Sequence, residues 1–283
     1  MNADLQARIE ALWEIRESIS PLTGGEARVA VESALEKLDS GELRVAECRA
    51  DTWVVNTWLK QAVLLSFRLN NNTLMQGAGG APVWDKVEQK FAGWGANRFT
   101  EAGFRAVPGA IVRRSAYIAP GVVLMPCFVN VGAYIDRGTM IDTWATIGSC
   151  AQIGRNCHIS AASQIGGVLE PVGALPVIIE DDVLIGGNCG VYEGSIVKRG
   201  AVLGSGTILN RSTPVYDIVR DQIYRATDDA PLIIPADAVV VAGSRAITSG
   251  TGKDWGLSIY TPIVVKYRDS KTDAKIQLED LLR

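Results

Sequence analysis

Two side chains within "TMIDTWATIGSCAQIGRNCHIS" (139–160) could carry acid–base chemistry. Asp142 follows Ile141, and a carboxylate beside an inward aliphatic residue on a β-face points outward, where it can anchor an amine and accept its proton. His158 is the single histidine of the 283 residues and is the rival base. One histidine does not make a tri-histidine zinc site, so we expect no metal. A turn-stabilising Asp142 and a surface or interface His158 are the structural alternatives.

The composition limits the partners that the chain can have. The formal net charge is −3 and no basic run occurs, so we expect neither nucleic acid nor an anionic membrane as a partner. The N-terminus is helix-periodic and lacks an apolar leader, and no apolar run approaches a membrane span, so we expect a cytoplasmic protein. Five cysteines without a C-x-x-C motif indicate structural thiols rather than a disulfide framework.

A six-residue repeat predicts the elements that position Asp142. Apolar residues recur at every sixth place from Ile111 to Ile165, and the count resumes at Ile178 and fails at Gly190. A period of six fits neither a helix nor an ordinary strand. Short repeats with one aliphatic residue and small turn residues are typical of a parallel β-solenoid. Three hexads would close one coil, so residues 110–218 predict about six coils.

The flanking segments predict two further regions. We expect an N-terminal α-helical cap domain at 1–105, the β-helix at 106–231, and C-terminal strands with a short helix at 232–283. Helical patterns lie in "DLQARIEALWEIRE", "ARVAVESALEKLDSG" and "WLKQAVLLSFRLN", whereas "LIIPADAVVVAG" and "LSIYTPIVVKY" are strand-like and "AKIQLEDLLR" is helical. The predicted fold class is therefore mainly β.

The chain also resembles a known family over nearly its whole length. "GFRAVP" (103–108), the stretch 123–154 around "GTMIDTWATIGSCAQIG", and "IGGVLEP" (165–171) are similar to the tetrahydrodipicolinate N-succinyltransferases, hexapeptide-repeat enzymes of lysine biosynthesis. The resemblance implies a left-handed β-helix and a homotrimer with sites at the subunit interfaces. It also implies that an acyl-CoA acylates the amine of L-2-amino-6-oxopimelate, the open form of tetrahydrodipicolinate. The alternative is a rigid scaffold without catalytic activity.

The resemblance also implies roles for individual residues. Asp142 matches the aspartate that the family assigns to the substrate amine, and His158 matches a position without a catalytic role there. Arg105 matches the arginine that binds a substrate carboxylate. A planar, permanently charged guanidinium suits that task because it binds a carboxylate through two parallel hydrogen bonds. A surface arginine paired with the N-terminal region is the alternative for Arg105.

Coenzyme A is expected along the C-terminal half of the prism, where small residues let a pantetheine arm approach the backbone. Candidate contacts for the acyl-CoA are Gly204, Ser205, Gly206, Ala242 and Gly243, with Lys253 and Lys266 available to its phosphates. Solenoid turns are rich in glycine for structural reasons, which is the alternative for each of these glycines. Residues 248–254 are expected to form a loop that folds over the thioester.

Gly190 departs from the family pattern, which carries a second active-site glutamate at this substrate-binding position. We expect its loss to leave empty volume beside the acyl group and to favour acetyl-CoA over succinyl-CoA as the donor. The chain would then be a diverged paralogue, for instance from tabtoxin biosynthesis. The alternatives are a catalytically impaired binding scaffold and a His158-dependent acetyltransferase of another small acceptor.

Overall fold

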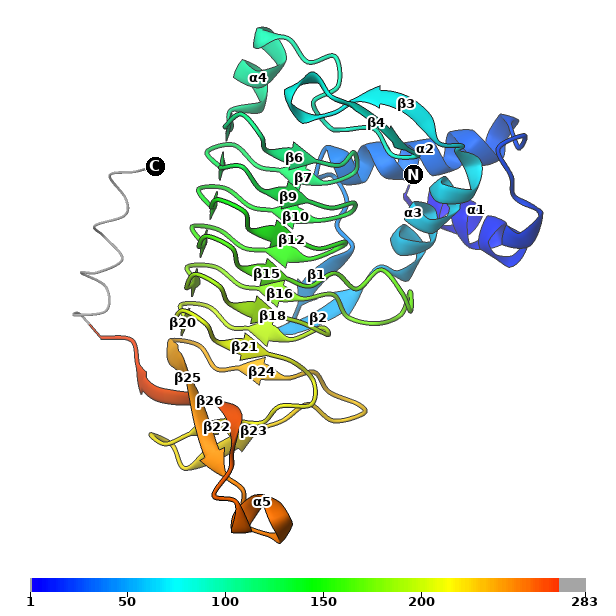
Figure 1. The fold of residues 1–283 in the computed structure, drawn as a ribbon. Helices are drawn as coiled ribbons and strands as arrows, with labels where there is room; N and C mark the ends of the chain where they lie inside the picture. The colour runs from blue at the N-terminus through cyan, green and yellow to red at the C-terminus, as the bar shows by residue number, and fades with distance from the viewer. Residues whose placement is uncertain (1, 270–283) are drawn as a thin grey trace.

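The computed structural model describes residues 2–269, and its centre is a three-sided parallel β-helix (Figure 1). The chain winds through two-residue strands, and each strand pairs with the strands one coil before and one coil after it. Three parallel sheets result, which we name the β11, β12 and β13 faces after one strand in each. The β12 face has six strands, so the predicted number of coils and the predicted fold class are confirmed.

The three faces contain the following strands. The β11 face contains β5 (Arg105–Ala106), β8 (Val123–Leu124), β11 (Met140–Ile141), β14 (His158–Ile159), β17 (Leu184–Ile185) and β20 (Val202–Leu203). The β12 face contains β6 (Ile111–Val112), β9 (Phe128–Val129), β12 (Thr146–Ile147), β15 (Gln164–Ile165), β18 (Gly190–Val191) and β21 (Ile208–Leu209). The β13 face contains β7 (Tyr117–Ile118), β10 (Tyr134–Ile135), β13 (Gln152–Ile153), β16 (Ile178–Ile179), β19 (Ile196–Val197) and β24 (Ile233–Ile234).

The second residue of each strand points into the prism, and the predicted count identifies it correctly only in the middle of the repeat. Every sixth residue from Val129 to Ile165 points into the prism, as predicted. Before and after them the count is one residue early, because Leu124 and Val129 are only five residues apart and a long loop follows Ile165. The prediction that the repeat fails at Gly190 is therefore wrong. Val191 is the inward residue of that strand and is fully buried.

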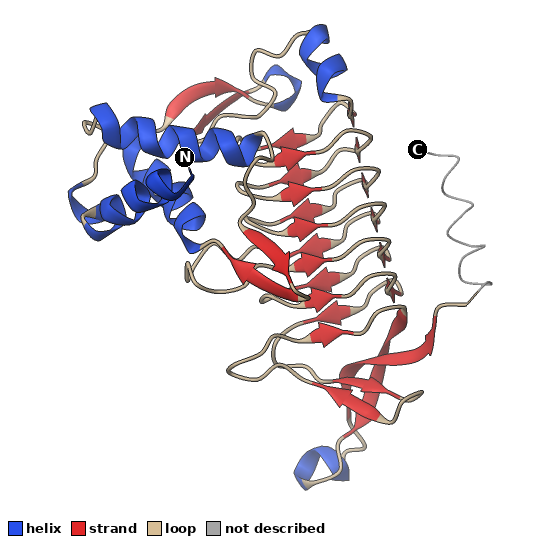
Figure 2. Ribbon diagram, turned by 180° about the vertical axis from the view of Figure 1, so that it is seen from behind, coloured by secondary structure: helices blue, strands red, loops and turns tan. Residues whose placement is uncertain are grey.

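An N-terminal helical region packs beside the first coils (Figure 2). The three predicted helices are confirmed as α1 (Asn2–Glu14), α2 (Gly25–Asp39) and α3 (Thr57–Leu69), and they share a core that also includes Val131 and Cys150 of the prism. Elements that the sequence did not predict are the strands β1 (Ala46–Arg49), β2 (Thr52–Val55), β3 (Thr73–Gln76) and β4 (Pro82–Asp85), the helix α4 (Ala96–Ala102), and two short 3₁₀ turns at Arg16–Ser18 and Ala78–Gly80.

The N-terminal region covers the β13 face of the prism. Arg44 lies over the ring of Tyr134 at 3.7 Å, and its Nε donates to Oε1 of Gln152 at 3.1 Å. Trp53 Nε1 donates to Oε1 of Glu180, also at 3.1 Å. Because outward side chains of the β13 face are engaged in this way, the other two faces are the ones on which to look for a site.

The C-terminal segment caps the last coil and continues into an arm. Its strands are β22 (Val215–Asp217), β23 (Gln222–Tyr224), β25 (Ala238–Ala246) and β26 (Ser258–Tyr267), and β25 extends the β11 face by pairing with β20. The predicted loop at 248–254 instead contains a short helix, α5 (Gly250–Asp254), at the tip of the arm. The predicted helix "AKIQLEDLLR" lies outside the described residues. Within residues 2–269, no helix combines the length and apolar character needed to span a bilayer.

Lys60 joins the helical region to the loop between β15 and β16. Its side chain is fully buried, and Nζ donates to the carbonyl oxygen of Ala174. Burial lowers the pKa of the Lys60 ammonium, because desolvation penalises its charged form. The folded protein therefore releases this proton at a lower pH than the unfolded chain does, and stability rises with pH between the two values.

We expect Lys60→Met to abolish this pH-dependent gain in stability. Methionine has a similar length and no charge, so the free energy of unfolding at pH 7 should stay within about 1 kcal/mol of wild type or exceed it. As the pH rises through the folded-state pKa toward the ordinary lysine value of 10.5, the wild type should gain stability relative to the variant. Urea unfolding at several pH values measures the difference, and the exposed Lys253→Met is the control. Parallel pH curves for wild type and Lys60→Met would contradict the expectation.

Candidate active site

Asp142 lies at the corner between β11 and β12, pointing away from the prism core as predicted. Its Oδ1 accepts hydrogen bonds from the backbone N–H of Thr143 at 2.6 Å and from the Thr143 hydroxyl at 3.2 Å. Its backbone N–H donates to Ile159 O at 2.9 Å, which ties the corner to the next coil. The side chain is 29% exposed, so the carboxylate is held in place and remains accessible.

His158 lies beside Asp142 rather than apart from it. In the register of β11 and β14, Met140 pairs with His158, and this places the imidazole one coil away from the carboxylate. Nε2 of His158 is 3.6 Å from Oδ2 of Asp142, and the histidine side chain is 12% exposed. The two candidate bases are therefore neighbours, a relation that their separation by 16 residues in the sequence did not reveal.

Arg105 occupies an outward position on the same β11 face. Strand register aligns it with Val123 and then with Met140, so it lies two coils from the strand that precedes Asp142. Two coil spacings correspond to about 10 Å. Within residues 2–269 the Arg105 guanidinium makes no hydrogen bond or ion pair, and the residue is exposed. Its planar fork is consequently available to a carboxylate of a ligand.

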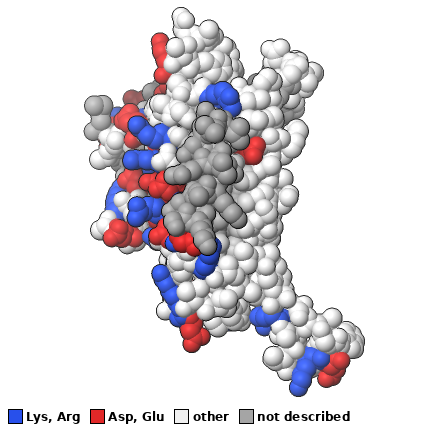
Figure 3. Space-filling model, turned by 90° about the vertical axis from the view of Figure 1, so that its left-hand side faces the viewer, with Lys and Arg blue, Asp and Glu red and all other residues white. Residues whose placement is uncertain are grey.

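Gly204, Ser205 and Gly206 lie on the same edge of the prism as Asp142, three coils further along. Backbone bonds of 2.9–3.0 Å connect this edge from coil to coil, from Ala162 N to Thr143 O, from Asn188 N to Ala161 O and from Gly206 N to Gly187 O. Small residues predominate along it. Figure 3 shows Lys, Arg, Asp and Glu gathered on one side of the prism, whereas the opposite side in that view carries few of them. A long, narrow ligand could lie against the backbone along the edge that carries Gly204, Ser205 and Gly206, because small residues leave the backbone accessible there.

The remaining coenzyme A candidates, Ala242, Gly243, Lys253 and Lys266, lie at different places along the arm. Ala242 and Gly243 lie close to Gly204, because a Cβ at Gly204 would be 3.2 Å from Cγ1 of Val241. A Cβ at Gly243 would crowd the side chain of Ile263 and lie 3.1 Å from the carbonyl oxygen of Thr261, so packing between β25 and β26 favours a small residue there.

The two lysines predicted to serve the phosphates of coenzyme A are far apart. Lys266 pairs in register with Val239 at the base of the arm, whereas Lys253 lies on α5 at its tip. The structure therefore does not bring Lys253 and Lys266 together at one phosphate group.

Gly190 is covered by an aromatic ring, so the expectation of empty volume at this position is wrong. A Cβ on Gly190 would lie 2.6 Å from Cε2 of Tyr192 and 3.0 Å from Cδ1 of Ile208. The glycine is on the β12 face, two coils beyond Thr146, so a single chain does not bring it to Asp142. Tyr192 also lines a pocket of about 870 Å³ at the opposite edge of the β12 face.

Glu193 lies on the rim of that pocket but is already engaged. Its Oε2 accepts the backbone N–H of Arg211 at 2.6 Å, and the Arg211 guanidinium in turn binds Thr227 O and Asp228. Glu193 itself occupies a corner with φ of 52°. The contact with Arg211 holds the Glu193 carboxylate at its own corner, so Glu193 does not replace a carboxylate at Gly190.

Trp144 is a neighbour of the site that the sequence did not single out. Its side chain is 72% exposed and its φ is 60°, a left-handed conformation that is unusual for a bulky residue. Its N–H donates to Pro126 O at 2.6 Å, which fixes the corner that carries Asp142. The signal available in the sequence was an aromatic residue at a turn place where other coils carry Ala162 or Gly206.

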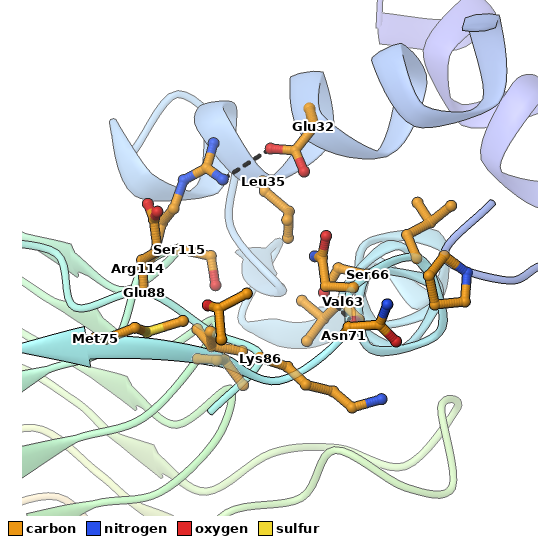
Figure 4. Close-up of a pocket in the computed structure, with 16 residues that line it drawn as sticks. Glu32, Leu35, Val63, Ser66, Asn71, Met75, Lys86, Glu88, Arg114 and Ser115 are labelled. Atoms are coloured by element: carbon orange, nitrogen blue, oxygen red, sulfur yellow. Dashed lines mark hydrogen bonds and ion pairs between the residues drawn. The ribbon is translucent and has the colours of Figure 1, made fainter. Parts of the chain in front are cut away.

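A different pocket, of about 410 Å³, lies between the helical region and the first coils (Figure 4). Glu32, Lys86, Arg114 and Ser115 are among its lining residues, and Arg114 pairs with Glu32 at 2.7 Å. None of the site residues predicted from the sequence lines it. It is therefore separate from the candidate active site.

The cysteines are free, as the sequence indicated, and four of the five are buried. Burial raises the pKa of Cys127, Cys150 and Cys157 to about 12, which keeps these thiols protonated and unreactive near neutral pH.

We expect an aromatic disulfide reagent to modify one thiol per native chain, Cys48, and all five in urea. Cys48→Ser should abolish the native reaction. Rapid modification of several thiols in the native protein would contradict this assignment.

Comparison with known proteins places the chain in a family. Residues 4–69 match the family described as tetrahydrodipicolinate N-succinyltransferase N-terminal, and residues 176–211 match the hexapeptide repeat of succinyl-transferase. The 2,3,4,5-tetrahydropyridine-2,6-dicarboxylate N-succinyltransferase of Rhodospirillum rubrum is 54% identical over 283 residues, which cover 99% of this chain and 97% of that protein. The protein of the same name from Paramagnetospirillum magneticum is 52% identical over 99% of both chains.

A solved structure agrees with the fold. The Campylobacter jejuni protein described as a 2,3,4,5-tetrahydropyridine-2-carboxylate N-succinyltransferase has a TM-score of 0.52 and 13% sequence identity, covering 89% of this chain and 65% of that one. The family assignment rests on the full-length relatives, which are more than half identical to this chain. The chain therefore belongs to the tetrahydrodipicolinate N-succinyltransferase family and is an N-acyltransferase built on hexapeptide repeats.

Proposed function

We propose that this protein transfers a succinyl group from succinyl-CoA to the amine of L-2-amino-6-oxopimelate, the open form of tetrahydrodipicolinate. The observation that carries the proposal is the identity of 51–54% with full-length relatives named for this succinyl transfer. The expectation of an acetyl donor rests on the missing glutamate and on an empty volume at Gly190, and the ring of Tyr192 covers Gly190. The relatives' names support neither the acetyl donor nor a toxin pathway.

Asp142 would act on the nitrogen of the acceptor. Its Oδ2, which Thr143 does not bind, accepts a proton from the substrate ammonium. The freed amine attacks the thioester carbonyl, the new C–N bond forms, and the C–S bond breaks. The nitrogen of the adduct loses one proton, the sulfur leaves with the electron pair of the C–S bond, and the thiolate takes up that proton, so the products are an amide and free coenzyme A. Asp142 must therefore be ionised when the acceptor binds.

Arg105 would bind a carboxylate of the same acceptor. It shares the β11 face with the strand that precedes Asp142, and the estimated 10 Å between their coils suits an extended dicarboxylate. The charge and the planar fork of Arg105 serve this binding without taking part in bond making.

The acyl-CoA would lie along the edge that runs from Asp142 to Gly204, Ser205 and Gly206. A homotrimer with sites at the subunit interfaces completes the proposal, because Gly190 lies two coils beyond Thr146 and one chain does not bring it to Asp142. A neighbouring copy could present its β12 face to the Asp142 edge.

Release of free thiol tests the donor and the acceptor together. We expect succinyl-CoA to exceed acetyl-CoA at least tenfold in kcat/KM with the amino-oxopimelate acceptor, a difference of about 1.4 kcal/mol in the transition state. A preference for acetyl-CoA would overturn the donor assignment. Binding of substrate without thiol release would indicate a scaffold.

Arg105→Lys should raise the KM for the acceptor about tenfold while leaving the KM for succinyl-CoA within about twofold. Lysine keeps the positive charge but loses the two parallel hydrogen bonds to a carboxylate. Steady-state kinetics with each substrate varied in turn measures the split, and Arg137→Lys, at an exposed corner, is the control. An unchanged acceptor KM would remove Arg105 from the site.

A further inference from the structure

The two oxygens of the Asp142 carboxylate have different surroundings. Oδ1 is held by both the N–H and the hydroxyl of Thr143. Oδ2 instead faces Nε2 of His158 at 3.6 Å. A carboxylate oxygen has two lone pairs, so Oδ2 can accept a hydrogen bond from an imidazole and still receive a proton from a substrate amine.

The fold holds the imidazole at this place. His158 and Asp142 belong to paired strands of adjacent coils, and the N–H of Asp142 donates to the carbonyl of Ile159 directly after the histidine. The neighbours of His158 at the same outward place are Met140 and Leu184, which are both apolar. Apolar walls strengthen an electrostatic contact between the ring and the carboxylate, because little water screens it.

From this geometry we propose that His158 is a positioning residue for Asp142. Nε2–H of the imidazole donates toward Oδ2, holds the plane of the carboxylate, and leaves the second lone pair of Oδ2 directed at the amine. The inference rests on the proposed role of Asp142 as the base. The 3.6 Å between Nε2 and Oδ2 is longer than a hydrogen bond, and we expect this distance to shorten when the substrate amine binds Oδ2.

Two substitutions separate positioning from the other roles that a histidine could play. Glutamine keeps an N–H donor near the place of Nε2 but does not take up a proton, whereas leucine keeps much of the bulk and has no donor. We expect His158→Leu to lower kcat about tenfold and His158→Gln to stay within about threefold of wild type, both with unchanged acceptor KM. Melting temperatures of both variants establish that they fold.

Two other kinetic results would overturn the proposal. Equal activity of the glutamine and leucine variants means that the N–H of His158 does not matter. A loss in both variants as large as that of Asp142→Asn means that His158 itself is the base. All values are ratios to wild type in the same assay, so absence of wild-type thiol release would count against the proposed function instead.

A second measurement does not depend on activity. Because His158 is the single histidine, its ring signals in a nuclear magnetic resonance spectrum need no further assignment. We expect a protected Nε2–H proton signal in the wild-type protein and its loss or a clear shift in Asp142→Ala. Asp136→Ala, which removes the carboxylate at the equivalent place one hexad earlier, is the control and should leave the signal unchanged. An identical signal in wild type and Asp142→Ala would overturn the proposal.

Discussion

Asp142→Asn should lower turnover about a hundredfold or more, because asparagine keeps the size of the side chain and loses the charge and the basicity that the amine requires. The amide oxygen can still accept the hydrogen bonds from Thr143, so the corner between β11 and β12 should keep its shape. We therefore expect a large fall in kcat with a melting temperature close to that of wild type. Thiol release under saturating donor and acceptor measures the loss.

The chain contains a matched control for this substitution. Asp136 follows β10 as Asp142 follows β11, and its Oδ1 accepts the N–H of the next residue, Arg137, at 2.7 Å. Asp136 lies at another edge of the prism, where it pairs with Arg155. Asp136→Asn should therefore leave turnover within about twofold of wild type. Tolerance of Asp142→Asn, or an equal loss in both variants, would refute the assignment of the base.

Gly190→Glu should destabilise the protein by about 1–3 kcal/mol, the usual cost of overpacking. The new Cβ would approach the ring of Tyr192 to 2.6 Å and Cδ1 of Ile208 to 3.0 Å, so the ring must leave its place. We expect Tyr192→Ala to relieve most of this cost when the two substitutions are combined. Urea unfolding of wild type, both single variants and the double variant gives the coupling energy.

A control separates steric conflict from the effect of a new charge. Gln164 pairs with Gly190 in register on the preceding coil of the β12 face. Gln164→Glu introduces a carboxylate there without adding volume, and it should cost less than Gly190→Glu does. If Gly190→Glu and Tyr192→Ala proved strictly additive, the ring would not be what limits position 190.

The periodic sequence determined the architecture by itself. Each coil must bury one aliphatic side chain per flat side, and this local requirement repeats in the chain as Ile135, Ile141, Ile147 and Ile153, all of which are buried. The helices α1 to α3 were equally predictable, because one face of each is apolar at helical spacing. The outward direction of Asp142 followed from the same alternation, since a strand points neighbouring side chains to opposite sides.

The tertiary structure decided what a count along the chain could not. A five-residue step at Leu124 and a loop after Ile165 shift the repeat, and only burial shows which residue then faces inward, so Val191 rather than Gly190 fills the core. Coil stacking brings His158 to Asp142, and a ring two residues away covers Gly190. These contacts depend on strand register and on side-chain direction in space, which a sequence pattern does not record.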